Sequence, residues 1–205
     1  WAGREIDETR RATFTTSTGD VRFLRSLHIN RLQPPTEVAE FLDVDQRQPP
    51  ASVKHERLVW RDISRPSQAR RIHATLLAPG PATGNSLSVA YFRDDDRARL
   101  LALLAIVSSV PAELQVRSLL MTNHVSLSVM RMLRVPELTP ERVAALAAAS
   151  EACLAGRASA SAELEAIVGA AYDLCFADWD RMARIIDIDD EERREVRACW
   201  DAHAR

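Results

Sequence analysis

Few of the side chains that could do chemistry in this chain stand at a useful spacing. The only lysine is Lys54, and Ser52 rather than an acid lies two residues before it, which excludes the common metal-dependent nuclease pattern. No two of the six glycines form the Gly-x-Gly turn with which methyltransferases hold their methyl donor, and no Gly-Lys-Ser/Thr phosphate loop occurs. The pairs Pro34-Pro35 and Pro49-Pro50 each follow a glutamine, so neither fits the Asn/Asp-Pro-Pro-Tyr loop that holds a flipped adenine. The sequence therefore predicts no catalytic residue in this chain.

The other reactive or ionisable side chains favour structural roles. The acidic triplet from Asp94 to Asp96 is typical of a helix start rather than a metal site, because carboxylates there interact well with the helix dipole. The five histidines are scattered and form no obvious nucleophile–base set. Cys153, Cys175 and Cys199 are widely spaced within expected helices. We therefore expect free, buried thiols in a reducing cytosol, and no metal site.

Composition indicates an ordinary globular protein. The chain has 205 residues, of which 46% are hydrophobic and 27% charged, which argues against disorder. The longest apolar run, Leu100 to Val107, is far too short to span a bilayer, so no membrane partner is expected. Because the sequence opens on Trp1 rather than Met, we expect it to begin inside a longer protein.

Charge is unevenly distributed along the chain. Residues 1–135 carry 19 basic and 14 acidic side chains, a balance of +5, whereas residues 136–205 carry 8 and 15, a balance of −7. Such a division indicates that the first part meets a polyanion and the second does not. All basic residues but one are arginines, which suit bidentate contacts with phosphate and guanine, although a GC-rich genome accounts for most of that bias.

Hydrophobic periodicity predicts an α+β fold. Strand patterns occur in residues 21–32, 57–63, 71–77 and 85–92, and residues 37–44 suggest a short helix between the two proline pairs. Helices are expected over residues 97–109 and 111–120, and everything after Thr139, an expected N-cap, reads as helical. We therefore predict a domain with a mixed sheet over residues 1–138 and a helical C-terminal subdomain over residues 139–205.

Ordered motifs in the middle of the chain resemble one family. The segment RLVWRDISR from Arg57 to Arg65 is similar to an R-x-x-x-R-D-I strand, and Arg71 to Gly80 with Ala82 to Leu87 is similar to a strand, a Pro-Gly turn and a G-N-S/T-L element. Further matches follow in Val107-Ser108-Ser109, Leu114 to Ser118, Thr122 to Leu127 (a T-x-H-V/I-S/N motif) and Arg134 to Pro136. The chain thus resembles the C-terminal target-recognition region, with a TaqI-like specificity domain, of adenine-specific type II restriction–modification proteins.

The resemblance extends to both ends of the chain. Gly3 to Arg10 is similar to the segment that leads into this region, and Ala162 to Val168 with Ala171 to Leu174 is similar to an L-D-A-I-V…Y-G-L helix, with Asp173 where glycine is usual. The chain departs from the family in Leu24 to Leu32, where Ser26 and Leu27 replace the Gly and Arg of a K-G-R motif.

The resemblance implies a function in DNA recognition. The chain would bind double-stranded DNA, choose the target sequence and orient the duplex. An upstream methyltransferase domain of the same protein would flip the adenine and bind S-adenosylmethionine, while this region itself needs no cofactor. A parent protein that also cuts DNA is compatible with the same resemblance.

From the resemblance we expect DNA contacts from arginines and polar loop residues, with Asn85 and Asn123 able to read adenine bidentately. The expected set is Arg61, Arg65, Arg70, Arg71, Asn85, Ser86, Arg117, Thr122, Asn123, His124 and Ser126. A turn role for Asn85 and a hydrogen-bonded loop role for His124 are the alternatives. Asp62 is expected to form a salt bridge that positions Arg61 or Arg65.

Two other functions stay open. The acidic helices of residues 139–205 could dock a partner subunit or a nuclease domain, which would make the chain a protein-interaction module. An independent enzyme of unknown type is the third alternative, and the missing motifs argue against it.

Overall fold

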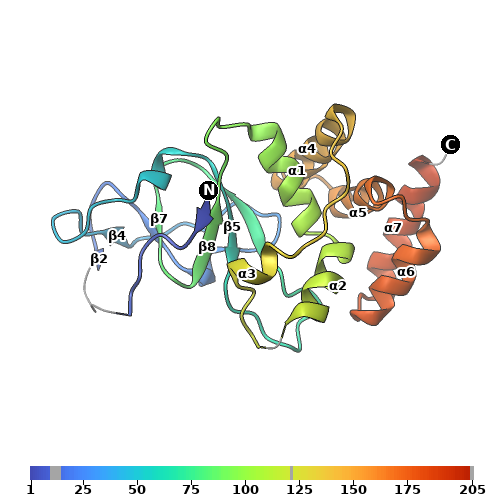
Figure 1. The fold of residues 1–205 in the computed structure, drawn as a ribbon, viewed down its shortest axis with the longest axis horizontal. Coiled ribbons are helices and arrows are strands. Elements are labelled where there is room, and N and C mark those ends of the chain that lie inside the picture. Colours follow the sequence, from blue (N-terminus) through green and yellow to red (C-terminus); the bar gives the residue numbers. More distant parts are fainter. Residues whose placement is uncertain (10–14, 121, 204–205) are drawn as a thin grey trace.

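The computed structural model describes residues 1–9, 15–120 and 122–203 and has an α+β fold (Figure 1). Its main sheet has four strands in the order β1-β8-β5-β6, all antiparallel. These strands are β1 (Ala2–Gly3), β8 (Leu87–Ala90), β5 (Arg57–Arg61) and β6 (Ala74–Leu77). The strands expected at residues 57–63, 71–77 and 85–92 are therefore confirmed, each with shorter bounds.

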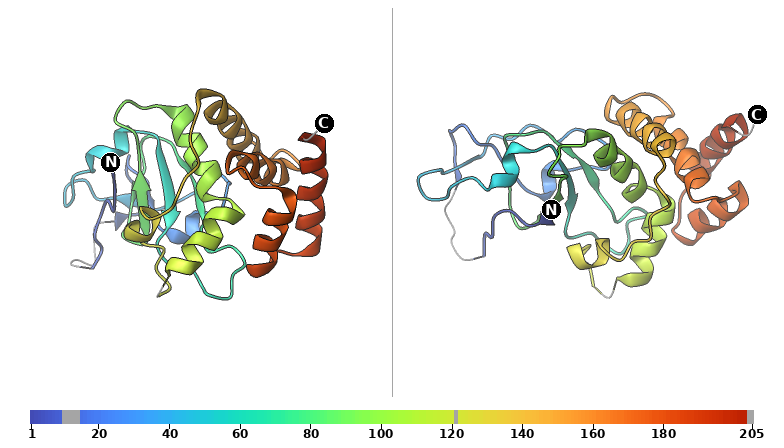
Figure 2. Two further views of the ribbon diagram at one scale, coloured as in Figure 1. Left: turned by 45° about the vertical axis from the view of Figure 1, so that its right-hand side comes forward. Right: turned by 45° about the horizontal axis from the view of Figure 1, so that its top comes forward.

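Alternating side chains give the main sheet two buried faces. Leu58 and Trp60 of β5 pack with helical residues in the largest hydrophobic cluster, whereas Val59 packs on the opposite face with Leu24 and Val89. Successive side chains of a strand point to opposite faces, so this strand is covered on both sides. Helices therefore cover one face of the sheet and the N-terminal segments cover the other (Figure 2).

Two small sheets organise the N-terminal segments. β2 (Thr15–Thr16) pairs antiparallel with β4 (Phe41–Leu42), and β3 (Phe23–Leu24) pairs parallel with β7 (Ala82–Thr83). The short 3-10 helix η1 (Ser26–His28) lies between β3 and β4, and η2 (Ala51–Lys54) lies between β4 and β5. The strand expected within residues 21–32 is thus only two residues long.

The short helix expected over residues 37–44 is wrong. This segment is extended and contains β4, whose Leu42 is buried in a cluster with Ile6 and Phe23. Pairing with β2, more than twenty residues earlier, provides the backbone hydrogen bonds that a helix would otherwise supply. Residues 10–14, which include the last residue of the Gly3 to Arg10 motif, lie outside the described residues.

Seven α-helices follow the sheet in the described part of the chain (Figure 1). They are α1 (Arg97–Val107), α2 (Val110–Leu119), α3 (Leu127–Met130), α4 (Pro140–Leu154), α5 (Ala160–Ala171), α6 (Phe176–Ile185) and α7 (Asp190–His203). Two expected helix starts are confirmed: the Asp96 carboxylate accepts a hydrogen bond from the Arg99 amide (2.9 Å), and the Thr139 hydroxyl accepts one from Arg142 (3.3 Å).

The largest hydrophobic cluster runs across the boundary expected between residues 138 and 139. It contains Leu58 and Trp60 of the sheet, Leu104 of α1, Leu146 of α4 and Leu164 of α5. The connection between α3 and α4 is extended, but the helices on its two sides share this core. The sheet and the first helices of the tail therefore stabilise one another.

A second cluster joins α6 and α7 to α5. Trp179, fully buried, packs with Ala183, Ile186 and Val196. Gly169 of α5 lies so close to Trp200 of α7 that an added Cβ would stand 2.0 Å from the indole ring. Glycine at this position allows the close approach of the two helices.

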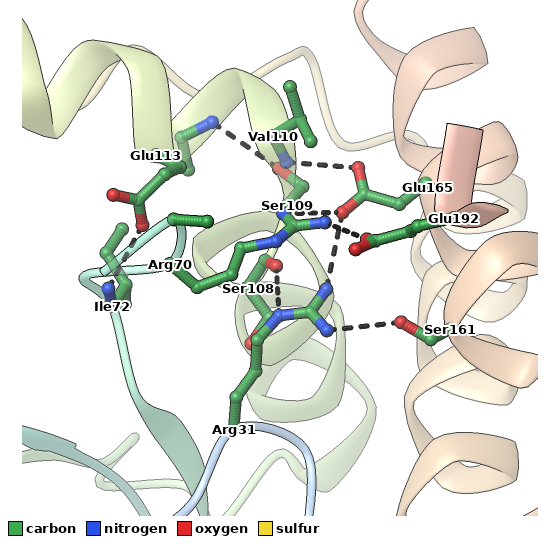
Figure 3. A network of polar contacts seen from close by, with 12 residues as sticks. Arg31, Arg70, Ile72, Ser108, Ser109, Val110, Glu113, Ser161, Glu165 and Glu192 are labelled. Atoms are coloured by element: carbon green, nitrogen blue, oxygen red, sulfur yellow. Dashed lines mark hydrogen bonds and ion pairs between the residues drawn. The ribbon is translucent and has the colours of Figure 1, made fainter. Parts of the chain in front are cut away.

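A buried carboxylate ties the sheet side of the molecule to the C-terminal helices (Figure 3). Glu165 of α5 is fully buried, and its Oε2 accepts hydrogen bonds from the Val110 amide and the Trp179 indole N–H, each at 3.0 Å. Its Oε1 forms ion pairs with Arg70 (2.9 Å) and Arg31 (3.3 Å). Glu165 thus connects the N-terminal segments, the loop before β6, α2 and α6.

The two arginines of this network are held by further acceptors. Arg70 also pairs with Glu192 of α7, and Arg31 donates to the Ser108 carbonyl (2.8 Å) and the Ser161 hydroxyl (3.1 Å). Burial and the adjacent Arg70 charge lower the pKa of Arg31 to about 10. For Arg70, the carboxylates of Glu165 and Glu192 outweigh the effect of burial and raise the pKa, so both guanidiniums are charged at neutral pH.

The three cysteines are free, as expected, but the expectation that all of them are buried is wrong. Cys153 is buried, and burial raises the pKa of its thiol to about 11. Cys175 is exposed at the start of α6, where its thiol lies 2.9 Å from the Asp178 carboxylate. Its place at a helix start, rather than within a packed helix face, explains the difference.

No single helix in the described ranges has the length and apolar character needed to cross a membrane. Among the described residues, α1 and α2 taken together, bent by 66°, are the one pair that would pass that test by length and composition.

We expect Glu165→Gln to lower the free energy of unfolding by on the order of 3 kcal/mol, because it leaves two buried arginines short of compensating charge. Urea unfolding monitored by tryptophan fluorescence measures the change. The matched control is Glu163→Gln on the same helix, which removes only a solvent-exposed pair with Arg157 and should have a far smaller effect. Equal stability of the two variants would contradict the central role of Glu165.

Candidate nucleic-acid interface

Two loops that are far apart in the sequence lie side by side at one end of the main sheet. The first follows β5, and the second connects α2 to α3. The Val125 amide donates to the Asp62 carbonyl (2.7 Å), and the Ser64 amide donates to the Asn123 carbonyl (3.0 Å). The Trp60 indole N–H donates to the Val125 carbonyl (3.0 Å), and these bonds fix the second loop on the first.

Asp62 is the polar centre of the two loops. Its side chain is buried, and Oδ2 lies 2.6 Å from the Arg4 guanidinium and 3.0 Å from His124 Nδ1. The pairing of Asp62 with Arg61 or Arg65 expected from the sequence is therefore wrong. Adjacent strand residues point to opposite faces, so Asp62 points away from Arg61 and instead meets residues of two other segments.

Contact with Asp62 fixes the orientation of the His124 ring. Because a carboxylate only accepts hydrogen bonds, Nδ1 must carry the proton and donate it to Asp62. The His124 side chain is 52% exposed, and its Nε2 has no hydrogen-bond partner among the described residues. Both alternatives considered for His124 are compatible with this geometry, since it is a hydrogen-bonded loop residue with one nitrogen left for a partner.

Several residues of the expected contact set are exposed on these loops. Arg65, Thr122 and Asn123 are exposed, as is His124. Ser126 is half-buried at the start of α3, and its hydroxyl lies 2.8 Å from that of Ser128. These residues can therefore contact a large ligand without any rearrangement of the fold.

Three expected DNA contacts have internal partners instead. Arg70 is held by Glu165 and Glu192. Arg71 is buried, and its guanidinium donates to the Ser64 hydroxyl (3.1 Å) and the Thr122 carbonyl (3.2 Å). Arg117 donates to the carbonyls of Gln68 (2.5 Å) and Ala69 (3.1 Å). In this structure Arg71 and Arg117 hold the loops in place from behind, and we omit all three from the contact surface.

Glu113, a buried carboxylate on α2, also holds these loops in place from within the fold. It accepts hydrogen bonds from the backbone amides of Arg71 (2.9 Å) and Ile72 (3.0 Å) and forms an ion pair with Arg117 (3.2 Å). Glu113 and Arg117 therefore both anchor the loop between β5 and β6 to α2.

The three remaining expected contacts, Arg61, Ser86 and Asn85, all lie next to residues of the N-terminal segments. Arg61 donates to the Ile29 carbonyl (2.6 Å) and the Asn30 side chain (2.9 Å). The Ser86 hydroxyl accepts a hydrogen bond from the Ser26 amide (3.0 Å). Asn85 is half-buried, and its amide lies 3.4 Å from Asp7.

Arg4 was missed by the sequence analysis, although it borders a polar cavity of about 360 Å³. The cavity is lined by Arg4, Glu5, Asp7, Thr9, Arg47 and Asn85. Glu5 lies beneath it in a fully buried ion pair with Arg57 (2.5 Å). Arg4 itself is half-exposed and touches both the cavity and Asp62, so it links Asn85 to the His124 loop. The only available signal was its place in the Gly3 to Arg10 motif.

His73 immediately precedes β6, and its Nε2 lies 3.3 Å from the Gln68 amide nitrogen. Burial, with the charges of Arg61 and Arg31, lowers the pKa of His73 from 6.5 to about 4. The ring is therefore neutral in the folded protein at physiological pH.

In the part of the chain that the structure describes, no three His, Cys, Asp or Glu side chains gather as metal ligands would. No family model matches the chain, and a search of curated proteins returns no match.

We expect Asp62→Ala to change the tautomer of neutral His124. In the native protein the acceptor at Asp62 keeps the proton on Nδ1, whereas a neutral imidazole in water prefers Nε2. Nitrogen-15 NMR of labelled histidine distinguishes the two tautomers. An Nε2-protonated His124 in the native protein would show that the Asp62 contact does not form in solution.

Stability should fall as the pH drops from 6.5 towards 4 because of His73. In this range the unfolded chain binds a proton at His73 and the folded chain does not, so lower pH favours unfolding. His73→Gln should reduce this pH dependence in urea titrations, while the smaller contribution of His28, whose pKa burial also lowers, stays. An unchanged pH profile in the variant would exclude a neutral His73 in the folded state.

Proposed function

We propose that this chain binds double-stranded DNA and reads its sequence, as the target-recognition region of a restriction–modification protein that methylates adenine. The observation that carries the proposal is the pair of hydrogen-bonded loops on which Arg65, Thr122, Asn123 and His124 are exposed, and to which Asp62 joins Arg4. Cations, amides and hydroxyls on neighbouring loops are the groups with which proteins contact phosphates and base edges.

The positions of the motifs support the proposal. The R-x-x-x-R-D-I and T-x-H-V/I-S/N motifs provide the two loops that hydrogen-bond to each other. Asp173, which stands where the family usually has glycine, has a φ of +57°, a conformation that favours glycine. Two motifs that are distant in the sequence are thus adjacent, and a third has the backbone that the resemblance implies.

In this proposal the contacts have different roles. Arg4 and Arg65 bind phosphates and set the register of the duplex, while Asn123 and the Nε2 of His124 read base edges. Asp62 positions both Arg4 and His124. The buried residues Arg71 and Glu113 keep the loops in one conformation, which reduces the entropy lost on binding.

Methyl transfer belongs to the proposed upstream domain, together with S-adenosylmethionine. The six glycines of this chain give no Gly-x-Gly turn, so its residues do not fit the cofactor. The role of the chain is to hold the duplex while the adenine is flipped elsewhere.

Fluorescence anisotropy with a labelled duplex tests the proposal. We expect binding that weakens as salt rises, and Arg65→Gln should reduce the slope of log K against log salt by about 1, the loss of one phosphate contact. Asn123→Ala should reduce discrimination against wrong bases by about 1–3 kcal/mol.

Arg181→Gln is the matched control, because Arg181 is exposed on α6, far along the chain from the two loops. It should leave both the affinity and the salt slope unchanged. Absence of salt-dependent binding at low ionic strength would refute DNA recognition and favour the alternative, a protein-interaction module that docks a partner through the acidic helices.

A further inference from the structure

The C-terminal helices hold a concentration of arginine that the acidic balance of this segment conceals. A cavity of about 510 Å³ lies between α6 and α7 and is lined by Phe176, Asp180, Arg184, Asp190, Arg193, Arg194 and Arg197. Its four arginines are half of the 8 basic residues found in residues 136–205. With two aspartates in the lining, the balance of charge is +2 (four minus two).

The two aspartates orient the arginines without using up their donors. Asp180 accepts from Arg184 Nε (2.8 Å) and Arg193 Nη1 (2.9 Å), and these bonds lower the pKa of its carboxyl, which is therefore ionised. The backbone carbonyl of Asp190 accepts from Arg194 Nε (3.2 Å), and its carboxylate pairs with Arg193. The two aspartates thus bind Arg184 and Arg194 through Nε, and they bind the terminal nitrogens of Arg193 alone.

The terminal nitrogens of the outer arginines remain unused. Arg184 and Arg194 are bonded through Nε, and Arg197 donates through Nε to Asp201 (3.1 Å) while its guanidinium stacks 4.7 Å from the Phe176 ring. Their Nη1 and Nη2 groups make no hydrogen bond to any residue in the described ranges. Arg193, only 11% exposed, has a buried Nε without a hydrogen-bond partner among the same residues.

We propose that the cavity between α6 and α7 binds a small phosphorylated ligand. Guanidinium groups hold phosphate oxygens with pairs of parallel N–H bonds, and a phosphate monoester near two negative charges matches the +2 balance. The volume lies within the range of about 300–1,000 Å³ typical of small-molecule sites. This site is separate from the proposed DNA interface and does not rest on that function.

Isothermal titration calorimetry of the full chain with pyrophosphate, in phosphate-free buffer at low salt, tests the proposal. We expect saturable binding that the double variant Arg184→Gln/Arg194→Gln weakens by at least on the order of tenfold, because it removes two phosphate-binding forks. Arg181→Gln, exposed on the same helix but outside the cavity lining, should leave the affinity unchanged. Circular dichroism of both variants checks that they are folded.

Any of three results would overturn the proposal. One is the absence of saturable heat at millimolar pyrophosphate, and another is an affinity unchanged in the double variant. The third is a double variant that weakens binding of duplex DNA while native protein does not bind pyrophosphate, which would assign these arginines to the DNA backbone. Loss of DNA binding in Arg65→Gln has no bearing on this site.

Discussion

The fold depends on the burial of one carboxylate. Glu165 loses all contact with water, and a buried charge is tolerated only when other groups compensate it. Arg31 and Arg70 supply the opposite charge, and Val110 and Trp179 complete its hydrogen bonds. These partners come from the N-terminal segments, the loop before β6, α2 and α6, so the burial of Glu165 requires all four to meet at α5.

The proposed interface lies at the end of a chain of contacts that starts from this network. Arg70 anchors one end of the loop between β5 and β6 in the Glu165 network, and Glu113 binds the adjacent amides of Arg71 and Ile72. The Arg71 guanidinium then reaches the loop that precedes His124. The exposed side chains of the interface therefore stand on loops whose backbone groups are largely paired, and their positions are set before a ligand arrives.

The sequence predicted best what local interactions decide. Asp96 and Thr139 cap helices by accepting hydrogen bonds from residues three positions later, so the local sequence is enough to predict their roles. β4 could not be recognised in this way, because its partner strand is distant in the sequence. The charged residues were hardest, since an arginine on the surface and one in a buried ion pair look alike in a sequence. Arg70 was expected to contact DNA at the surface, but it is buried in an ion pair. Arg4 was not expected to contact DNA, but it is half-exposed.

The ion-pair network of Arg31, Arg70 and Glu165, extended by the partly exposed Glu192, has a consequence for how such sequences can diverge. Loss of one charge leaves another stranded in the interior, so single substitutions at these positions are disfavoured until a second one follows. Replacement of the whole set by apolar residues of similar volume carries no such penalty. Related chains should therefore keep the charges of Arg31, Arg70 and Glu165 together or lose them together, and these three positions should covary although they lie up to 134 residues apart (165 minus 31).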